Sequence, residues 1–299
     1  MAIELSELVL QNIIDDQVTY IMAGERKARE LSTMVEESLG IAKHVKVMAK
    51  RQTIIEGPPG VGKSHTTKQT CETGGVQPIE IGTGSSLSYI ATKLAYADYW
   101  TPKNQEIVVI WDDADDVVFG EKKHANIWKN VFMDDENRPR FMHNVNLSNE
   151  IKKLEKDPTM AKMVEAMRAY MPEDAMGIEI PMDRFRHIFL TNFDYEAISE
   201  KSRTQWMAPI VDRFNYNRLK YEWTTAWGWL SYVLLNSQPF ERYGIDLTEE
   251  QKIKIINWMF DKWDKMGNKQ TYRTVREMAQ YIINEPNNYL NRWQKFIRK

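Results

Sequence analysis

Eight consecutive residues near position 60 carry the most specific chemical signal in the chain. Glycines in such a segment let backbone N–H groups turn inward and line a nest for phosphate oxygens. In the pattern of glycine, four residues and Gly-Lys-Ser, the lysine can reach the terminal phosphates of a nucleotide and the serine can bind Mg²⁺. We therefore predict a nucleoside triphosphate loop, with ATP and Mg²⁺ as ligands, at Gly57, Pro58, Pro59, Gly60, Val61, Gly62, Lys63 and Ser64.

A run of carboxylates provides a second signal. Asp112 and Asp113 directly follow the apolar stretch 107–111. A carboxylate at a strand end beside a phosphate loop is where Mg²⁺ coordination is needed. We expect Asp112 to belong to the metal shell, directly or through water. Because Asp115 and Asp116 extend the run, the alternative is a solvated acidic loop.

The elements that would position these residues alternate between strands and helices. The apolar run 107–110 is typical of a strand that is buried on both faces. Strands alternating with helices predict an α/β fold, with a parallel sheet sandwiched by helices. The expected strands are 52–56, 78–81, 106–111, 187–191 and a closing strand at 218–222, and the expected helices include 64–73 and 86–99.

The two ends of the chain read differently from this middle part. Residues 1–50 show helical spacing of apolar residues, and from about 223 onward the sequence predicts helices only. There Thr248 begins a capping box, Gly267 is a plausible helix stop, and Thr271 opens another helix. We therefore expect an N-terminal helical segment at 1–50, a nucleotide-binding core at 51–222 and a smaller helical domain at 223–299.

Over about residues 52–285 the chain resembles the AAA+ ATPase family. The resemblance implies that the helical domain is a lid and that Asp113 polarises the attacking water. The family normally has Glu at that position, and one methylene less shortens the reach by about 1.5 Å. Asn192 resembles the sensor-1 residue that orients this water; its alternative is a strand-end turn residue.

Two arginines are further candidates through this resemblance, and each has a rival. The segment 209–214 resembles the arginine-finger segment, so Arg213 would reach the nucleotide of the next subunit, with Arg203 as its rival. Such a cation stabilises charge in the transition state. The segment 272–276 resembles sensor 2, where Arg273 fits better than Arg276 because it lies at the start of a helix. An ordinary surface position is the alternative for each.

The spacing between Asp112 and Asn192 indicates an insertion. It is long for this family, so we place an extra helical element near 134–182. One interpretation is a substrate-engaging element or pore loop. The other is a helical hairpin packed on the core.

Composition excludes several classes of protein. The net charge of −2 shows no overall basic field for nucleic acid, and the single Cys71 excludes an internal disulfide framework. The sequence has no apolar run of about 18 residues and no signal peptide at its start, so we expect no membrane contact and a cytoplasmic location.

The phosphate loop predicts an ATPase, and the resemblance to the AAA+ family implies that it remodels a protein or protein–nucleic-acid client as a homo-oligomeric ring or arc, with a hexamer as one candidate. The segments 82–86, 111–115 and 188–193 resemble small AAA+ ATPases encoded by bacteriophages, which implies a role in phage DNA metabolism inside the host cytoplasm. One alternative is an ATP-controlled DNA-binding switch such as a replication loader. Another is a monomeric phosphate-loop kinase.

Overall fold

The chain divides into two compact units. The computed structural model describes residues 6, 9, 12–39, 51–133, 139–143, 148–171, 177–193, 207–220, 222–236 and 240–297. The helical unit comprises Met1–Thr33, Gly57–Thr66 and Leu219–Lys299, and the sheet unit comprises Met34–Glu56 and Thr67–Arg218. This division differs from the expected segments 1–50, 51–222 and 223–299, because both the N-terminal helix and the phosphate loop group with the C-terminal helices.

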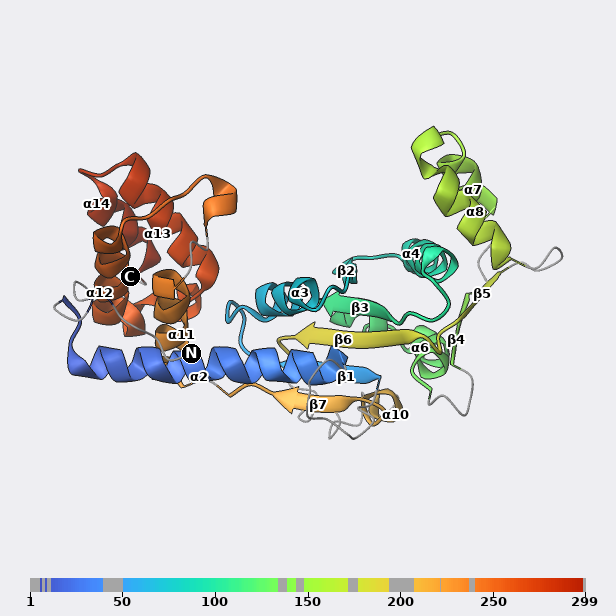
Figure 1. Ribbon diagram of the computed structural model, residues 1–299, viewed down its shortest axis with the longest axis horizontal. Coiled ribbons are helices and arrows are strands. Elements are labelled where there is room, and N and C mark those ends of the chain that lie inside the picture. The colour runs from blue at the N-terminus through green and yellow to red at the C-terminus, as the bar shows by residue number, and fades with distance from the viewer. Residues whose placement is uncertain are drawn as a thin grey trace. The chain divides into compact units, whose positions relative to one another are not determined.

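The sheet unit is built on a five-stranded, fully parallel sheet (Figure 1). This finding confirms the predicted α/β class and the parallel sheet. Helix α4 (Leu87–Trp100) connects the second strand to the third. In spatial order, the strands are β2 (Ile79–Gly82), β3 (Ile107–Asp112), β6 (Phe185–Thr191), β1 (Gln52–Glu56) and β7 (Asn215–Arg218).

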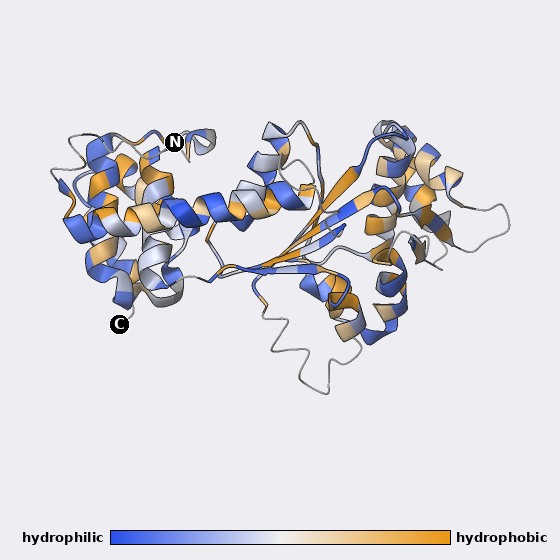
Figure 2. Ribbon diagram, turned by 60° about the horizontal axis from the view of Figure 1, so that its bottom comes forward, coloured by the Kyte–Doolittle hydropathy of each residue, from blue (hydrophilic) through white to orange (hydrophobic). Residues whose placement is uncertain are grey.

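Burial explains which strands the sequence revealed. The first five residues of β3 are buried and carry apolar side chains on both faces. All of β1 is buried too, but only Ile54 and Ile55 in it are apolar. Figure 2 shows the central strands largely in orange, the colour of hydrophobic residues. The closing strand predicted at 218–222 was wrong. The strand is β7, which carries the polar sequence NYNR and pairs with β1 alone at the sheet edge.

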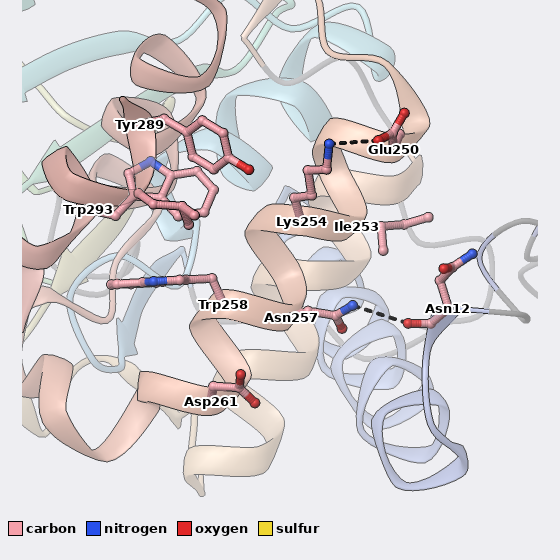
Figure 3. A pocket seen from close by; sticks show the side chains of 10 residues that line it. Asn12, Glu250, Ile253, Lys254, Asn257, Trp258, Asp261, Tyr289 and Trp293 are labelled. Carbon is pink, nitrogen blue, oxygen red and sulfur yellow. Dashed lines mark hydrogen bonds and ion pairs between the residues drawn. The ribbon is translucent and has the colours of Figure 1, made fainter. Parts of the chain in front are cut away.

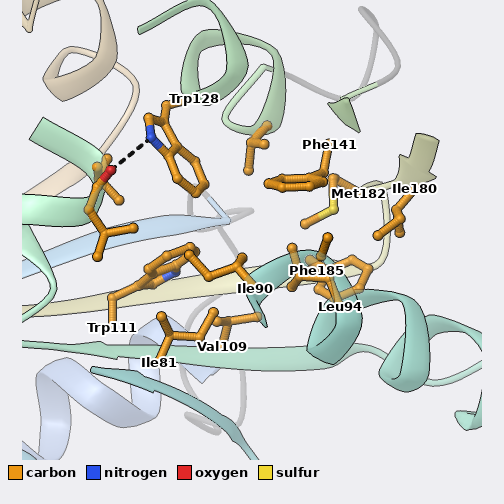
Figure 4. Close-up of a cluster of buried hydrophobic side chains, with 14 of the residues drawn as sticks. Ile81, Ile90, Leu94, Val109, Trp111, Trp128, Phe141, Ile180, Met182 and Phe185 are labelled. Carbon is orange, nitrogen blue, oxygen red and sulfur yellow. Dashed lines mark hydrogen bonds between the residues drawn. The ribbon is translucent and has the colours of Figure 1, made fainter. Parts of the chain in front are cut away.

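Aromatic side chains pack among aliphatic ones in the core of the sheet unit (Figure 4). Trp111 of β3 stacks on Phe189 of β6, with ring centroids 5.0 Å apart, and meets Trp128 edge-on at 5.3 Å. The Trp128 indole donates a hydrogen bond to the Val117 carbonyl at 3.1 Å. Trp128 lies on α6 (Ala125–Val131), and Val117 lies on α5 (Asp115–Phe119). These contacts hold the ends of β3 and β6 together and fix α5 against α6.

His187 is a buried polar residue in this core. The Trp111 indole donates to His187 Nδ1 at 3.1 Å, and burial lowers the pKa of the histidine to about 3. The imidazole therefore stays neutral at physiological pH, as a hydrogen-bond acceptor within the sheet.

The region of the expected insertion contains strands as well as helices. Strand β4 (Arg140–His143) pairs antiparallel with β5 (Ile178–Pro181). Between them lie α7 (Ser148–Leu154), η3 (Pro158–Met160) and α8 (Ala161–Ala169). Helix α8 packs on α4, as the hydrogen bond from Thr92 Oγ1 to Met167 Sδ illustrates. The expected purely helical element is therefore an antiparallel strand pair that carries helices.

The helical unit packs around a second core rich in tryptophan. Helix α2 (Asp15–Leu39) begins in this unit and crosses α11 so closely that a methyl group at Gly24 would lie 2.1 Å from the Trp229 backbone nitrogen. The predicted Thr248 capping box and Thr271 N-cap are both present. The remaining elements are α11 (Trp223–Asn236), η5 (Glu241–Tyr243), α12 (Glu249–Met266), η6 (Gly267–Lys269), α13 (Tyr272–Asn284), α14 (Tyr289–Trp293) and η7 (Gln294–Phe296). Across the described helices, none is long and apolar enough to span a membrane.

Candidate functional site

The predicted phosphate loop lies in the helical unit, directly after β1 in the chain and directly before α3 (Lys63–Thr73). Gly60 and Gly62 both have positive φ angles, +80° and +81°. Residues with a Cβ adopt this conformation only at a cost. The two glycines are therefore required by the shape of the turn, as the sequence pattern predicted.

Lys63 is held inside this loop. Its side chain is buried, and its Nζ donates hydrogen bonds to the Gly57 carbonyl at 2.7 Å and to the Pro58 carbonyl at 2.9 Å. A buried ammonium within a glycine turn is the cation that a triphosphate needs. Ser64 follows in the first turn of α3. The residues of the loop thus fit a nucleotide phosphate group.

Two helices of the same unit pack against the loop. A methyl group at Gly62 would lie 2.2 Å from the Trp229 ring of α11, and one at Gly60 would lie 2.8 Å from Cβ of Thr271, the N-cap of α13. The His65 ring lies nearly parallel to that of Tyr272, with centroids 6.5 Å apart. Because Trp229 and Thr271 leave no room for larger side chains, the glycines serve packing as well as backbone conformation. No local pattern in the sequence predicts this packing.

The structure also separates the two arginines of α13. Arg273 lies in the first turn, exposed, and two residues after the Thr271 that contacts Gly60. The Arg276 guanidinium instead stands 4.7 Å from the centre of the Tyr243 ring. This arrangement favours Arg273 as the arginine available to a ligand of the loop.

The acidic residues lie at the carboxyl edge of the sheet. Asp112 is the last residue of β3, opposite Leu190 of β6. Asp113 follows with φ of +50°, the one non-glycine residue with a positive φ among those that the structure describes. Its backbone N–H donates to the Leu190 carbonyl at 3.1 Å. The exposed carboxylate of Asp113 accepts a hydrogen bond from Asn192 Nδ2 at 2.9 Å.

The loop after β2 completes this edge. The Thr83 hydroxyl donates to the backbone carbonyl of Asp113, and the Gly84 N–H donates to Asp116 Oδ2 at 3.3 Å. Asp113 is therefore the carboxylate that Asn192 contacts, whereas Asp116 holds a neighbouring loop. The acidic run is thus bonded to other segments and is more than a solvated loop. Thr83 and Gly84 could have been suspected, because neighbouring parallel strands end at one edge.

Arg213 lies near the opposite, amino ends of the strands, two residues before β7. Its guanidinium donates to the carbonyl of Pro209, the second residue of the short helix α10 (Ala208–Val211). Asp113 and Asn192 follow carboxyl ends. The structure therefore does not bring Arg213 to the acidic edge of its own sheet. Arg203 lies outside the described residues.

Two oxygen donors are the candidate metal ligands, Ser64 in the first turn of α3 and Asp112 at the end of β3. Within the described residues, no group of three or more His, Cys, Asp or Glu side chains could hold a metal ion by itself. Mg²⁺ is commonly held by one or two protein oxygens together with substrate phosphates. Hydroxyl and carboxylate donors of this kind fit Mg²⁺.

A separate pocket of about 590 Å³ lies in the helical unit (Figure 3). Side chains of α12 and α14 line it, together with Asn12, whose backbone carbonyl accepts from Asn257 Nδ2 at 3.1 Å. Neither the phosphate loop nor Arg273 contributes to its lining. The pocket is therefore distinct from the predicted nucleotide site.

Comparisons with known proteins add little to this geometry. No protein-family profile matches the sequence, and a search of curated proteins gives no match. Among solved structures, PCH-2 from C. elegans resembles the chain at a TM-score of 0.34 and 12% identity, over 97% of this chain and 70% of that one. A likeness at this level carries no argument about activity.

Proposed function

We propose that this chain is an ATP hydrolase of the AAA+ type that works as a homo-oligomer with Mg²⁺. The observation that carries the proposal is the bond between Asp113 and Asn192 at the carboxyl edge of the sheet. In the parallel register of β1 and β6, Glu56 lies opposite Thr191. Glu56 precedes the phosphate loop, and Thr191 precedes Asn192. Ligands of open α/β sheets bind outside the carboxyl ends of the strands, where the strand order reverses. Here it reverses at β1, with β6 on one side and β7 on the other.

The proposed chemistry assigns one task to each residue. Inward-facing N–H groups of the loop and the Lys63 ammonium neutralise the phosphates of ATP. Asp113 accepts a proton from a water molecule, whose oxygen bonds to the terminal phosphorus as the bond to the leaving ADP oxygen breaks. Asn192 fixes the carboxylate and orients the water. Mg²⁺, held by Ser64 and Asp112, would offset charge on the phosphate oxygens.

The helical unit supplies the second element of this proposal. Its contacts at Gly60 and Gly62 make α11 and α13 sensitive to the state of the loop. Arg273, in the first turn of α13, would contact phosphate as a sensor. We assign the helices at 223–299 the role of a lid whose movement converts nucleotide state into work on a client.

Arg213 is assigned to the site of a neighbouring subunit. Its position at the amino ends of the strands supports action in trans, because Asp113 and Asn192 follow the carboxyl ends. Strand β7 alone spans four residues, or about 13 Å, between these edges. This feature favours an oligomeric ATPase over a monomeric kinase, which needs no second subunit.

The experiment that tests this assignment mixes two defective variants. Arg213→Ala should bind ATP but hydrolyse it poorly, whereas Lys63→Ala should lack ATP binding and keep its finger. Mixed assemblies contain junctions that join an intact site to an intact finger. ATPase activity should therefore exceed the sum of the separate variants, and specific activity should rise with protein concentration.

Arg292→Ala is the matched control, because Arg292 is an exposed arginine of α14 whose partner is Glu285. It should keep wild-type activity. If no ratio of the two variants restores hydrolysis, and gel filtration with ATP gives a monomer at every concentration, the action of Arg213 in trans is refuted.

The client is a protein or protein–nucleic-acid assembly in this proposal, and the strand pair β4–β5 with α7 and α8 is the candidate element for engaging it. The bacteriophage-like segments support a role in phage DNA metabolism. Stimulation of hydrolysis by a protein client would favour remodelling. Stimulation by DNA would favour the alternative of a replication loader.

A further inference from the structure

Helix α4 carries a line of exposed aromatic residues that the proposed ATPase chemistry does not use. Tyr89, Tyr96 and Trp100 are 47%, 37% and 41% exposed. With Lys93 they recur at intervals of four, three and four residues. At about 100° per residue these four side chains lie within about 60° of arc, along about 16 Å of the helix. We call Tyr89, Lys93, Tyr96 and Trp100 the α4 stripe.

The stripe borders α8 but is not covered by it. On the adjoining side of α4, Thr92 bonds to Met167 and the Tyr99 hydroxyl donates to Glu165 at 3.0 Å. At the end of the stripe, the Trp100 indole donates to the Lys162 carbonyl at 3.2 Å, at the start of α8. These contacts fix the Trp100 ring while part of it remains exposed.

Lysine ammonium groups lie close to the aromatic rings at both ends of the stripe. Lys93 Nζ stands 5.0 Å from the centre of the Tyr89 ring, and Lys162 Nζ stands 5.2 Å from that of Trp100. Among the described residues neither lysine forms an ion pair with a carboxylate. Lys93 donates to the Glu80 backbone carbonyl, while the Glu80 carboxylate pairs with Lys68. Both ammonium groups thus keep a charge that an anionic ligand can use.

Flat aromatic faces next to unpaired cations match one class of ligand. Bases of single-stranded nucleic acid stack on aromatic rings, while lysines neutralise the phosphates between them. Protein interfaces also use Tyr and Trp, but they are depleted in Lys. Double-stranded nucleic acid keeps its bases stacked on each other and cannot use the rings.

We propose that the α4 stripe, together with Lys162, binds single-stranded nucleic acid by base stacking and phosphate contacts. The inference stands without the ATPase, since binding needs neither Lys63 nor Asp113. It also agrees with a net charge of −2, because stacking on a few rings requires no overall basic field.

The test uses fluorescence anisotropy with labelled oligothymidylate of about 20 nucleotides, without ATP, and oligouridylate of the same length in a second arm. Wild-type protein should bind the single strands. Trp100→Leu and Tyr96→Leu should each weaken binding about tenfold, the effect of losing one stacked base. Binding of both oligomers supports stacking alone, and preference for one shows that the 2′-hydroxyl or the thymine methyl group is read.

Matched variants separate this effect from damage to the fold. Trp223→Leu removes a tryptophan of similar exposure, 48%, from α11 and should not change binding. Lys93→Gln and Lys162→Gln should each reduce the slope of log K against log salt by about 0.7. Lys295→Gln, whose lysine pairs with Glu277, should leave the slope unchanged. Circular dichroism verifies that each variant is folded. If Trp100→Leu does not fold, Tyr96→Leu tests the stacking in its place.

Three results would overturn the proposal. The first is no binding of either oligomer at low salt. The second is an equal loss of oligonucleotide affinity in Trp100→Leu and Trp223→Leu. The third is duplex binding that equals single-strand binding and is unaffected by the stripe variants. Conversion of an oligomer to a monomer by Trp100→Leu, without any oligonucleotide binding, would assign the stripe to contact between subunits instead.

Discussion

The turns after β1 and β3 both contain residues with positive φ, and they use different residue types to do so. After β1, the phosphate loop places glycines at φ of +80° and +81°. After β3, the chain places Asp113 at +50°. Glycine suits the first turn because backbone N–H groups are the functional atoms there. At the second turn a side chain is retained although an L-residue pays about 1 kcal/mol for this conformation.

The difference shows what each turn delivers. The glycine turn forms a concave backbone surface and leaves the charged side chain to Lys63, the residue after the turn. The Asp113 turn delivers the carboxylate itself and fixes it with Asn192 and Thr83. Strained residues that the surroundings hold in place are typical of functional sites. The strain at Asp113 therefore favours a chemical role for its carboxylate.

The largest effect is expected from a substitution that removes ATP binding by the phosphate loop. Lys63→Ala removes the buried ammonium and should reduce ATP affinity by at least about 100-fold, as expected for the loss of charged hydrogen bonds. Hydrolysis should then fall below detection. Lys68→Ala, on the same helix but paired with Glu80, is the control and should bind normally in isothermal titration. Near-normal affinity in Lys63→Ala would exclude this loop as the nucleotide site.

The next effect tests the second turn. Asp113→Asn keeps the shape of the side chain but removes the base, so hydrolysis should fall about 10²- to 10³-fold while ATP affinity is unchanged. Asp113→Glu lengthens the reach by about 1.5 Å and should hydrolyse faster than Asp113→Asn. Single-turnover assays with bound ATP measure both. Normal turnover in Asp113→Asn would transfer the role of base to Asp115 or Asp116.

A third effect separates packing from conformation at the glycines. Gly62→Ala combines a positive φ with a methyl group 2.2 Å from the Trp229 ring, so it should cost about 3 kcal/mol of unfolding free energy. Gly75 has φ of +71° with nothing within 4 Å of its would-be methyl group. Gly75→Ala should therefore cost only about 1 kcal/mol. Equal losses in denaturant titrations would show that Trp229 does not restrict the loop.

The sequence predicted the parts that depend on local pattern. Strand β1 matches the expected 52–56, and the Thr248 capping box is a local hydrogen-bond pattern that four residues specify. Strand β7 was misplaced because its NYNR sequence pairs through its backbone at an edge and needs no apolar pattern. Strands β4 and β5 were missed because four residues each give too short an alternation to recognise.

Long-range contacts were beyond the sequence for a different reason. The bond between Asn192 and Asp113 joins residues 79 positions apart, and only the register of β3 and β6 brings them together. The packing of Trp229 and Thr271 on the loop glycines likewise depends on how the helical unit folds. The phosphate loop and the acidic run identified the candidate site residues from the sequence. The residues that contact them in the fold could not be predicted.

The smallest expected effect sharpens the comparison between the two turns. Asp113→Gly should remove the strain of the positive φ, a gain of about 1 kcal/mol, but glycine adds about as much entropy to the unfolded chain. The unfolding free energy should therefore change by less than about 0.5 kcal/mol, although hydrolysis is lost. Asp112→Gly is the matched variant, since Asp112 lies in β3 with extended pairing and has no such strain to release. It should cost about 1 kcal/mol. Urea titrations of both variants measure the difference. If Asp113→Gly destabilises as much as Asp112→Gly, the bonds to Asn192 and Thr83 outweigh the strain, and the carboxylate contributes to the fold as well as to the chemistry.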